Sequence, residues 1–134
     1  MKKTGKVVFN YGDDQEFIKA SPTVGATPDG LIAEDEGLEV KCPDSKTHYE
    51  RLRFLNAENF KEKEKQYYWQ IQGCMYVTGR KRWYFVDYDP RFKNEEKRLL
   101  IIVIERNEED ITKLKRKLFL ANKEYKEQLN FLRN

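Results

Sequence analysis

Residues 26–43 constrain the fold more than any other stretch, because they contain two short strand signals around a polar turn. The second signal alternates apolar and charged side chains, in the order Leu38, Glu39, Val40, Lys41 and Cys42. Side chains on a strand point alternately to opposite faces, so we expect the apolar set to contact the core and the charged pair to face solvent. An antiparallel register that pairs odd positions with odd positions brings Asp29 onto the face of Glu39 and Lys41.

Two carboxylates and an ammonium group on one face form a candidate site for phosphodiester hydrolysis. A phosphodiester is anionic and repels an attacking anion, so its hydrolysis needs cations on the phosphate and an activated water beside it. Magnesium is usually held by one or two carboxylates, which Asp29 and Glu39 could supply. Lys41 could orient or deprotonate the water while it holds a phosphate oxygen. The alternative is an exposed hairpin with a charged face.

Pro28-Asp29, followed after nine residues by Glu39-Val40-Lys41, resembles the PD-(D/E)XK nuclease signature. The resemblance is more specific to the phage lambda exonuclease and YqaJ-type viral recombinase family. The matching segments are PDGL at 28–31, GLEVKCP at 37–43, QIQ at 70–72, MYVT at 75–78, WYF at 83–85, YDPR at 88–91 and VIER at 103–106. They occur in the order of the family and cover roughly residues 20 to 110.

The resemblance implies an α/β fold with a restriction-endonuclease-like core, in which helices flank a mixed central β-sheet. It also implies that Asp29, Glu39, Lys41 and Gln70 are catalytic. A Mg²⁺ site, in which Mn²⁺ could substitute, would be formed by Asp29, Glu39 and the backbone carbonyl of Val40. Without the resemblance, Gln70 is either exposed or part of a polar site, because a buried amide without partners is costly.

Our first hypothesis for the function is a magnesium-dependent DNA nuclease of recombination type, which digests double-stranded DNA from an end. The resemblance also implies a single-strand annealing protein as a partner and a homotrimer as the assembly. One alternative is a nuclease fold retained as a DNA- or protein-binding module without turnover. Another is a structure-specific or nicking endonuclease that uses the same centre.

The length of 134 residues predicts a single nuclease-like domain over residues 1–134. The family resemblance implies a longer amino-terminal region, whose helices add an acidic residue near the metals and basic residues that grip the DNA end. We expect this chain to lack those helices, as a compact variant, a fragment or a reduced homologue. We therefore expect weak, distributive activity, or none without a partner.

Composition excludes a disordered chain but does not identify a nucleic-acid binder, because 39% of residues are hydrophobic and the formal net charge is only +3. No apolar run approaches the roughly 20 residues of a membrane-spanning helix. Residues 1–4 lack the apolar segment of a signal peptide. Cys42 and Cys74 occupy apolar positions without metal-type spacing, which predicts buried free thiols. These features favour a soluble protein with no membrane partner, in the cytoplasm of a bacterial or phage-infected cell.

The remaining patterns predict the other strands and helices. We expect a hairpin formed by residues 6–10 and 15–20, a strand at 83–88, and a strand at 99–104 that is buried on both faces at the centre of the sheet. We expect a helix after Pro43, capped by Asp44 or Ser45, and another over residues 66–78, ended by Gly79. From Glu108 onward, apolar residues at three- and four-residue intervals predict a long amphipathic helix.

Two groups of polar residues remain open in role. His48 is the only histidine, which excludes a histidine-clustered metal site and a catalytic triad, and we expect it at the surface. Interleaved cations and aromatic residues around the strand at 83–88 are typical either of phosphate-backbone contacts or of charged turns. These cations are Arg80, Lys81, Arg82, Arg91, Lys93, Lys97 and Arg98.

Overall fold

The computed structural model describes residues 5–21 and 24–133, so the start at residues 1–4 lies outside the described residues. In chain order the elements are β1 (Val8–Phe9), the 3₁₀ helix η1 (Gly12–Asp14), β2 (Ile18–Ser21), β3 (Val24–Ala26), β4 (Gly30–Ile32), β5 (Glu36–Lys41), α1 (Ser45–Phe54), α2 (Phe60–Lys63), α3 (Lys65–Thr78), β6 (Arg82–Tyr88), the 3₁₀ helix η2 (Glu95–Lys97), β7 (Leu99–Glu105) and α4 (Glu108–Arg133). The predicted α/β class is confirmed.

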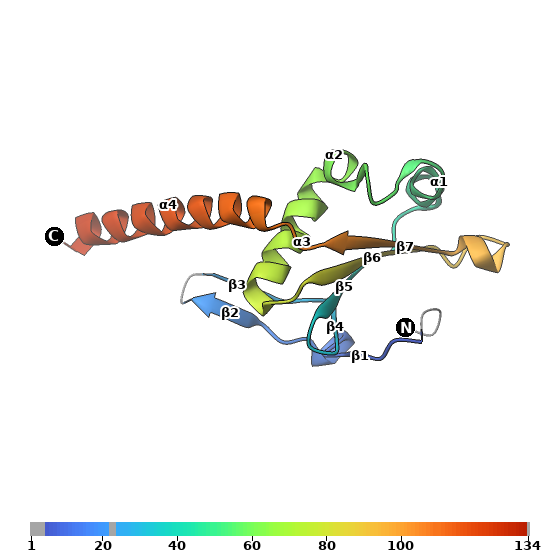
Figure 1. The fold of residues 1–134 in the computed structure, drawn as a ribbon, viewed down its shortest axis with the longest axis horizontal. Coiled ribbons are helices and arrows are strands. Elements are labelled where there is room, and N and C mark those ends of the chain that lie inside the picture. Colours follow the sequence, from blue (N-terminus) through green and yellow to red (C-terminus); the bar gives the residue numbers. More distant parts are fainter. Residues whose placement is uncertain (1–4, 22–23, 134) are drawn as a thin grey trace.

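Five strands form a mixed sheet in the order β1-β4-β5-β6-β7 (Figure 1). β5 and β6 are parallel, whereas the other neighbouring strands are antiparallel. A parallel pair needs a crossover connection, which α1, α2 and α3 provide. The three helices lie on one side of the sheet (Figure 1). The predicted mixed sheet with flanking helices is therefore confirmed.

The prediction that residues 99–104 lie at the centre of the sheet is wrong. They belong to β7, which pairs only with β6 within the described sheet and forms its edge, while β5 lies in the middle. The aliphatic run has a different cause, because β7 contributes to two apolar clusters. Ile102 and Ile104 pack on the helix side, and Leu99 and Ile101 pack on the other side.

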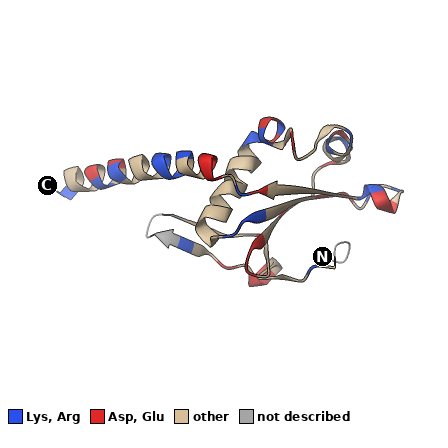
Figure 2. Cartoon of the chain, in the orientation of Figure 1, with Lys and Arg blue, Asp and Glu red and all other residues tan. Residues whose placement is uncertain are grey.

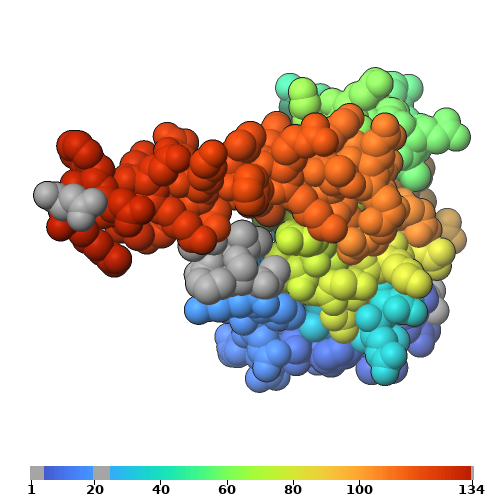
Figure 3. Space-filling model, turned by 60° about the vertical axis from the view of Figure 1, so that its left-hand side comes forward, coloured from blue at the N-terminus to red at the C-terminus, as the bar shows by residue number. Residues whose placement is uncertain are grey.

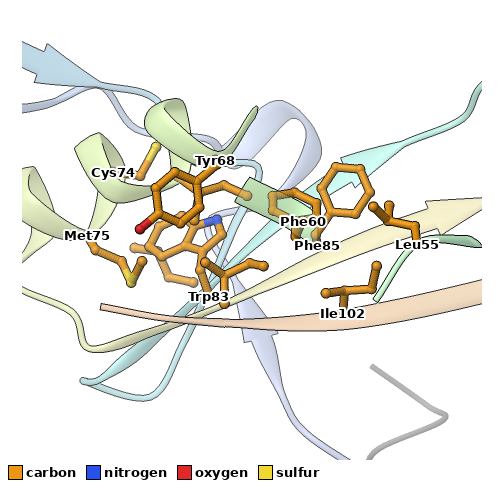
Figure 4. Close-up of a cluster of buried hydrophobic side chains, with 11 residues drawn as sticks. Leu55, Phe60, Tyr68, Cys74, Met75, Trp83, Phe85 and Ile102 are labelled. Carbon is orange, nitrogen blue, oxygen red and sulfur yellow. The ribbon is translucent and has the colours of Figure 1, made fainter. Parts of the chain in front are cut away.

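The main core lies between the sheet and the helices (Figure 4). Trp83 and Phe85 of β6 are completely buried there, against Phe60 of α2 and Met75 of α3. A smaller cluster on the opposite face contains Ile32, Leu38, Tyr84 and Val86. β6 is thus covered on both faces, which explains why nearly all of its side chains are buried.

The alternation predicted for β5 is correct and Leu38 is buried as predicted, but the prediction is wrong for Glu39, Val40 and Cys42. Glu39, expected in solvent, is only 5% exposed on the helix side, where it lines a cleft with side chains of α3. Leu38 joins the smaller cluster, whereas Val40 is 37% exposed and Cys42 is exposed. The smaller cluster ends before Val40, so the apolar face of β5 is covered for only part of its length.

The predicted hairpin of residues 6–10 and 15–20 is also wrong. β1 pairs with β4 in the main sheet, and β2 pairs with β3 in a separate two-stranded sheet. Between them, Tyr11–Asp14 contains η1 instead of a tight hairpin turn. The two apolar segments therefore pair with later strands and not with each other.

The predicted start of α1 and the predicted end of α3 are confirmed within one residue. The side chain of Asp44 accepts a hydrogen bond from Thr47 N at 2.8 Å and caps α1. α3 ends at Gly79, which adopts a left-handed conformation with φ of 72°.

The predicted long amphipathic helix is confirmed as α4. Its first turn is fixed in the core, because Ile111 is completely buried and Asp110 binds Lys61 and Tyr68. Further along, Tyr125 is 50% exposed and Leu132 is 77% exposed. The second half of α4 stands clear of the body of the molecule (Figure 3). No helix in the described ranges is long and apolar enough to cross a membrane.

We predict that Gly37→Ala destabilises the fold, because an added Cβ would lie 2.1 Å from Cζ3 of the buried Trp83 ring. Overpacking of this kind costs about 1–3 kcal/mol in the free energy of unfolding. Urea unfolding followed by tryptophan fluorescence measures the loss. Gly73→Ala is the matched control, because its Cβ would meet Leu114 at an ordinary 3.7 Å and alanine favours the helix. An unchanged urea midpoint for Gly37→Ala would contradict the prediction.

Candidate active site

The register between β4 and β5 brings Asp29 next to Glu39. Leu31 pairs with Gly37 and Gly30 pairs with Leu38, so odd positions face odd positions, as predicted. Extending this register by one pair puts Asp29 opposite Glu39. The Asp29 side chain is fixed there because its Oδ2 accepts a hydrogen bond from Val40 N at 2.8 Å.

Glu39 and Lys41 form an ion pair on the helix side of β5. Lys41 Nζ lies 3.0 Å from Glu39 Oε1. Burial raises the pKa of Glu39 above its usual value, the Lys41 ammonium group opposes this shift, and the nearby Asp29 charge adds to it. Burial lowers the pKa of Lys41, but the Glu39 carboxylate outweighs burial and leaves that pKa above its usual value. The two carboxylates and the ammonium group are thus electrostatically coupled.

An aromatic ring and a second cation border this ion pair. Lys41 Nζ lies 4.6 Å from the centre of the Tyr67 ring, and the Arg51 guanidinium lies 5.7 Å from the same ring. Arg51 is itself held by ion pairs with Asp87 at 2.5 Å and with Glu64 at 3.0 Å. Tyr67 and Arg51 were not predicted as site residues from the sequence. The available signal was that Tyr67 precedes Gln70 by three residues and can share its helical face.

Gln70 lies on the exposed side of α3 and lines the same cleft as Glu39. The volume of this cleft is about 280 Å³. Asp29 lines a second hollow of about 650 Å³ with Val40, on the side of β1. The structure therefore groups Asp29, Glu39 and Lys41 closely and puts Gln70 across the cleft from Glu39. The neighbouring Gln72 has a structural role, because its buried side chain bonds the backbone of Glu105 and Asn107.

The donor atoms fit a hard divalent cation better than a zinc-type site. In residues 5–21 and 24–133, no cluster of three or more histidine, cysteine, aspartate or glutamate side chains could hold a metal ion. Asp29 and Glu39 offer two carboxylates, and Val40 lies between Glu39 and Lys41 with its N–H bound to Asp29. Magnesium accepts this kind of site, because it usually keeps several waters and takes further oxygens from substrate phosphate.

The prediction that His48 lies at the surface is wrong, because its side chain is completely buried at the end of β6. Its Nδ1 bonds the Asp87 carboxylate, and its Nε2 lies 2.7 Å from the carbonyl of Lys97. Asp87 is also completely buried, so the carboxylate needs the partners that His48 and Arg51 supply. This network fastens α1 to the strand next to β5.

Several cations considered as phosphate contacts stabilise turns in the structure. Arg80 donates to two backbone carbonyls at the β4–β5 turn, Arg91 pairs with Asp89, and Arg98 donates to a backbone carbonyl of its own loop. Arg82 pairs with Glu105 across two strands. Phosphate contact stays a prediction for the remaining cations of this group, Lys81, Lys93 and Lys97.

The comparisons with known proteins agree with this geometry. The sequence model of the YqaJ-like viral recombinase domain family matches residues 2–81. The chain is 54% identical over 39 residues to the uncharacterized protein ExoD of Escherichia coli (strain K12). These 39 residues are 29% of this chain and 42% of ExoD.

Three solved structures share the fold. The alkaline exonuclease LHK-Exo of Laribacter hongkongensis superposes with a TM-score of 0.80 and 28% identity, over 98% of this chain and 63% of that chain. The structure of LHK-Exo in complex with dAMP superposes with a TM-score of 0.73 and 31% identity, over 93% of this chain and 60% of that chain. A phage related exonuclease of Haemophilus somnus 129PT superposes with a TM-score of 0.72, over 98% of this chain and 66% of that chain. Its sequence identity of 17% supports the fold alone. The chain spans less than two thirds of each of these proteins.

The two cysteines differ, contrary to the prediction that both are buried. Cys74 is buried, and burial together with the Glu39 and Asp29 charges raises the pKa of its thiol to about 12. Cys42 is exposed because the apolar face of β5 is uncovered at its end. Since the thiolate is the reactive form, the two thiols should react at very different rates.

We predict that one thiol of the native protein reacts rapidly with a chromogenic disulfide reagent near pH 8. With a pKa of about 12, only about one Cys74 thiol in ten thousand is ionised at that pH, and the group is also shielded. Absorbance during the reaction should show one fast thiol in the native state and two in urea. Cys42→Ser should abolish the fast phase, and a fast phase that persists in this variant would contradict the assignment.

Proposed function

This chain belongs to the YqaJ-like viral recombinase domain family, and we propose that it is a magnesium-dependent deoxyribonuclease that hydrolyses double-stranded DNA from an end. The observation that carries the proposal is the odd-to-odd register of β4 and β5, which puts Asp29 opposite Glu39 and beside Lys41. The likeness to an alkaline exonuclease at 28% identity supports the same chemistry. The complex of that exonuclease with dAMP supports a nucleotide product.

Each residue of the site has a separate role in this proposal. Asp29, Glu39 and the carbonyl of Val40 would hold Mg²⁺ or Mn²⁺, which supplies positive charge to the scissile phosphate and makes water more acidic. Lys41 would orient the attacking water and hold a phosphate oxygen, because its ammonium group lies on the face of both carboxylates. Gln70 would contact substrate from the opposite wall of the cleft.

Tyr67 and Arg51 would keep Lys41 in place. The Tyr67 ring is close to both cations, and the ion pairs of Arg51 to Asp87 and Glu64 fix that side of the site. A cation over an aromatic ring gains about 0.5–2 kcal/mol, which is enough to favour one orientation of a lysine side chain. A single-strand annealing partner and assembly into a trimer stay predictions of the family resemblance.

The decisive experiment uses end-labelled linear duplex DNA and closed circular duplex DNA, each with magnesium or with a chelator. We expect mononucleotides from the linear substrate with magnesium, and no digestion with the chelator. Cleavage of the circle would favour the endonuclease alternative. Binding of DNA without cleavage of either substrate would favour the binding module.

The same assay on Glu39→Gln tests the metal ligands, because the change keeps the shape of the side chain and removes its charge. We expect no measurable digestion and a weaker manganese isotherm in titration calorimetry. Glu34→Gln, an exposed residue of the β4–β5 turn, is the control and should behave like the unaltered protein. An unchanged isotherm for Glu39→Gln would remove Glu39 from the ligand set.

Lys41→Ala should slow the chemical step while the affinity for metal is not weakened. A positioned proton-transfer or electrostatic group contributes ~10²–10⁴-fold in rate, so single-turnover cleavage should fall by that factor. Lys46→Ala provides a control, because Lys46 is exposed on the first turn of α1. Unaltered single-turnover rates in Lys41→Ala would exclude this lysine from the chemistry.

A further inference from the structure

The cleft that contains Glu39 and Gln70 continues between α3 and α4, where its lining changes. Tyr76 of α3 and Leu114 and Leu118 of α4 form that part. Tyr76 follows Gln70 by six residues, which corresponds to about 9 Å along the helix. The cleft therefore offers polar groups from Glu39 and Gln70, and an aromatic ring and aliphatic side chains from α3 and α4.

A lysine lies at the edge of this second part. Lys115 Nζ is 5.4 Å from the centre of the Tyr76 ring, and the Lys115 side chain is exposed. The cation and the ring can therefore contact the same ligand. Such a ligand would have an apolar flat group for the ring and an anionic group for the lysine.

Lys and Arg follow the acidic first turn of α4 in this part of the helix (Figure 2). Residues 113–123 contain five cations and no acid, whereas the whole chain has a formal net charge of only +3. The cations are Lys113, Lys115, Arg116, Lys117 and Lys123. The segment thus attracts anions more strongly than the net charge of the chain indicates.

We propose that the groove between α3 and α4 binds single-stranded DNA next to the scissile phosphate, with a base stacked on Tyr76 and a backbone phosphate on Lys115. Aromatic rings combined with a basic groove are typical of single-strand binding. The cleft volume of about 280 Å³ is close to that of the smallest ligand pockets, about 300 Å³, and is far smaller than a DNA duplex. The placement of the scissile phosphate beside Glu39 rests on the proposed function, whereas the binding of a strand can be measured without cleavage.

Fluorescence anisotropy with a labelled oligothymidylate in a chelator measures this binding, and a gel confirms that the oligonucleotide stays intact. Lys115→Ala should weaken binding several-fold and reduce the slope of log K against log salt by about 0.7, the value for one phosphate of a single strand. Lys126→Ala is the matched control. Lys126 lies eleven residues further, which is nearly the same helical direction but about 16 Å beyond Lys115.

Tyr76→Leu tests the stacking contact and should weaken binding about five-fold or more, with an unchanged salt slope. Tyr76→Phe keeps the ring and should bind like the unaltered protein, while circular dichroism checks that both variants are folded. Equal losses in Lys115→Ala and Lys126→Ala would overturn the proposal, because they would indicate a diffuse charge effect. No measurable binding of the oligonucleotide by the unaltered protein would also overturn it.

The outcome can be separated from that of the proposed function. If the protein digests duplex DNA but Lys115→Ala and Tyr76→Leu bind the oligonucleotide normally, the groove is refuted and the nuclease assignment stands. If both variants lose binding but no DNA is digested with magnesium, the groove stands and the nuclease assignment fails.

Discussion

The candidate site depends on the register of β4 against β5. A shift of one residue would move every side chain of β4 to the opposite face of the sheet. Asp29 would then lie away from Glu39, and its hydrogen bond to Val40 N would be lost. The smaller apolar cluster would be lost as well, because Ile32 and Leu38 would no longer share a face. The same pairing therefore determines both the packing of this region and the geometry of the site.

The crossover helices hold the other side of the site. β5 and β6 are parallel, so their carboxyl ends meet at the same edge, where Lys41 pairs in register with Asp87. The buried Asp87 binds His48 and Arg51 of α1, and Arg51 also binds Glu64 at the start of α3. This chain of contacts connects β6 to α1 and to the start of α3. It leaves the Tyr67 ring over Lys41, although Tyr67 and Lys41 are far apart in sequence.

The alternation of β5, the odd-to-odd register and the glycine end of α3 could be predicted from the sequence, because each depends on local spacing. The identity of the covered face could not, because alternation gives two faces and the position of α3 decides which is buried. Glu39 and Cys42 were assigned to the wrong faces for this reason. The role of His48 was missed because its partner Asp87 is 39 residues away. The aliphatic run of β7 indicated a strand covered on both faces, which suggested the centre of the sheet. An edge strand whose two faces join two apolar clusters needs the same aliphatic side chains.

The burial of Glu39 is difficult to explain by folding alone. An ionised carboxylate under a helix loses hydration, and the nearby Asp29 charge makes that position less favourable still. Lys41 offsets part of this cost, but an apolar residue on this strand would stabilise the fold more simply. Residues that weaken a fold in this way are concentrated at functional sites, where the charge is needed for binding or chemistry. Two residues earlier on the same face, Gly37 leaves room for the buried Trp83 ring, so this face of β5 changes from core packing to a charged site within two residues.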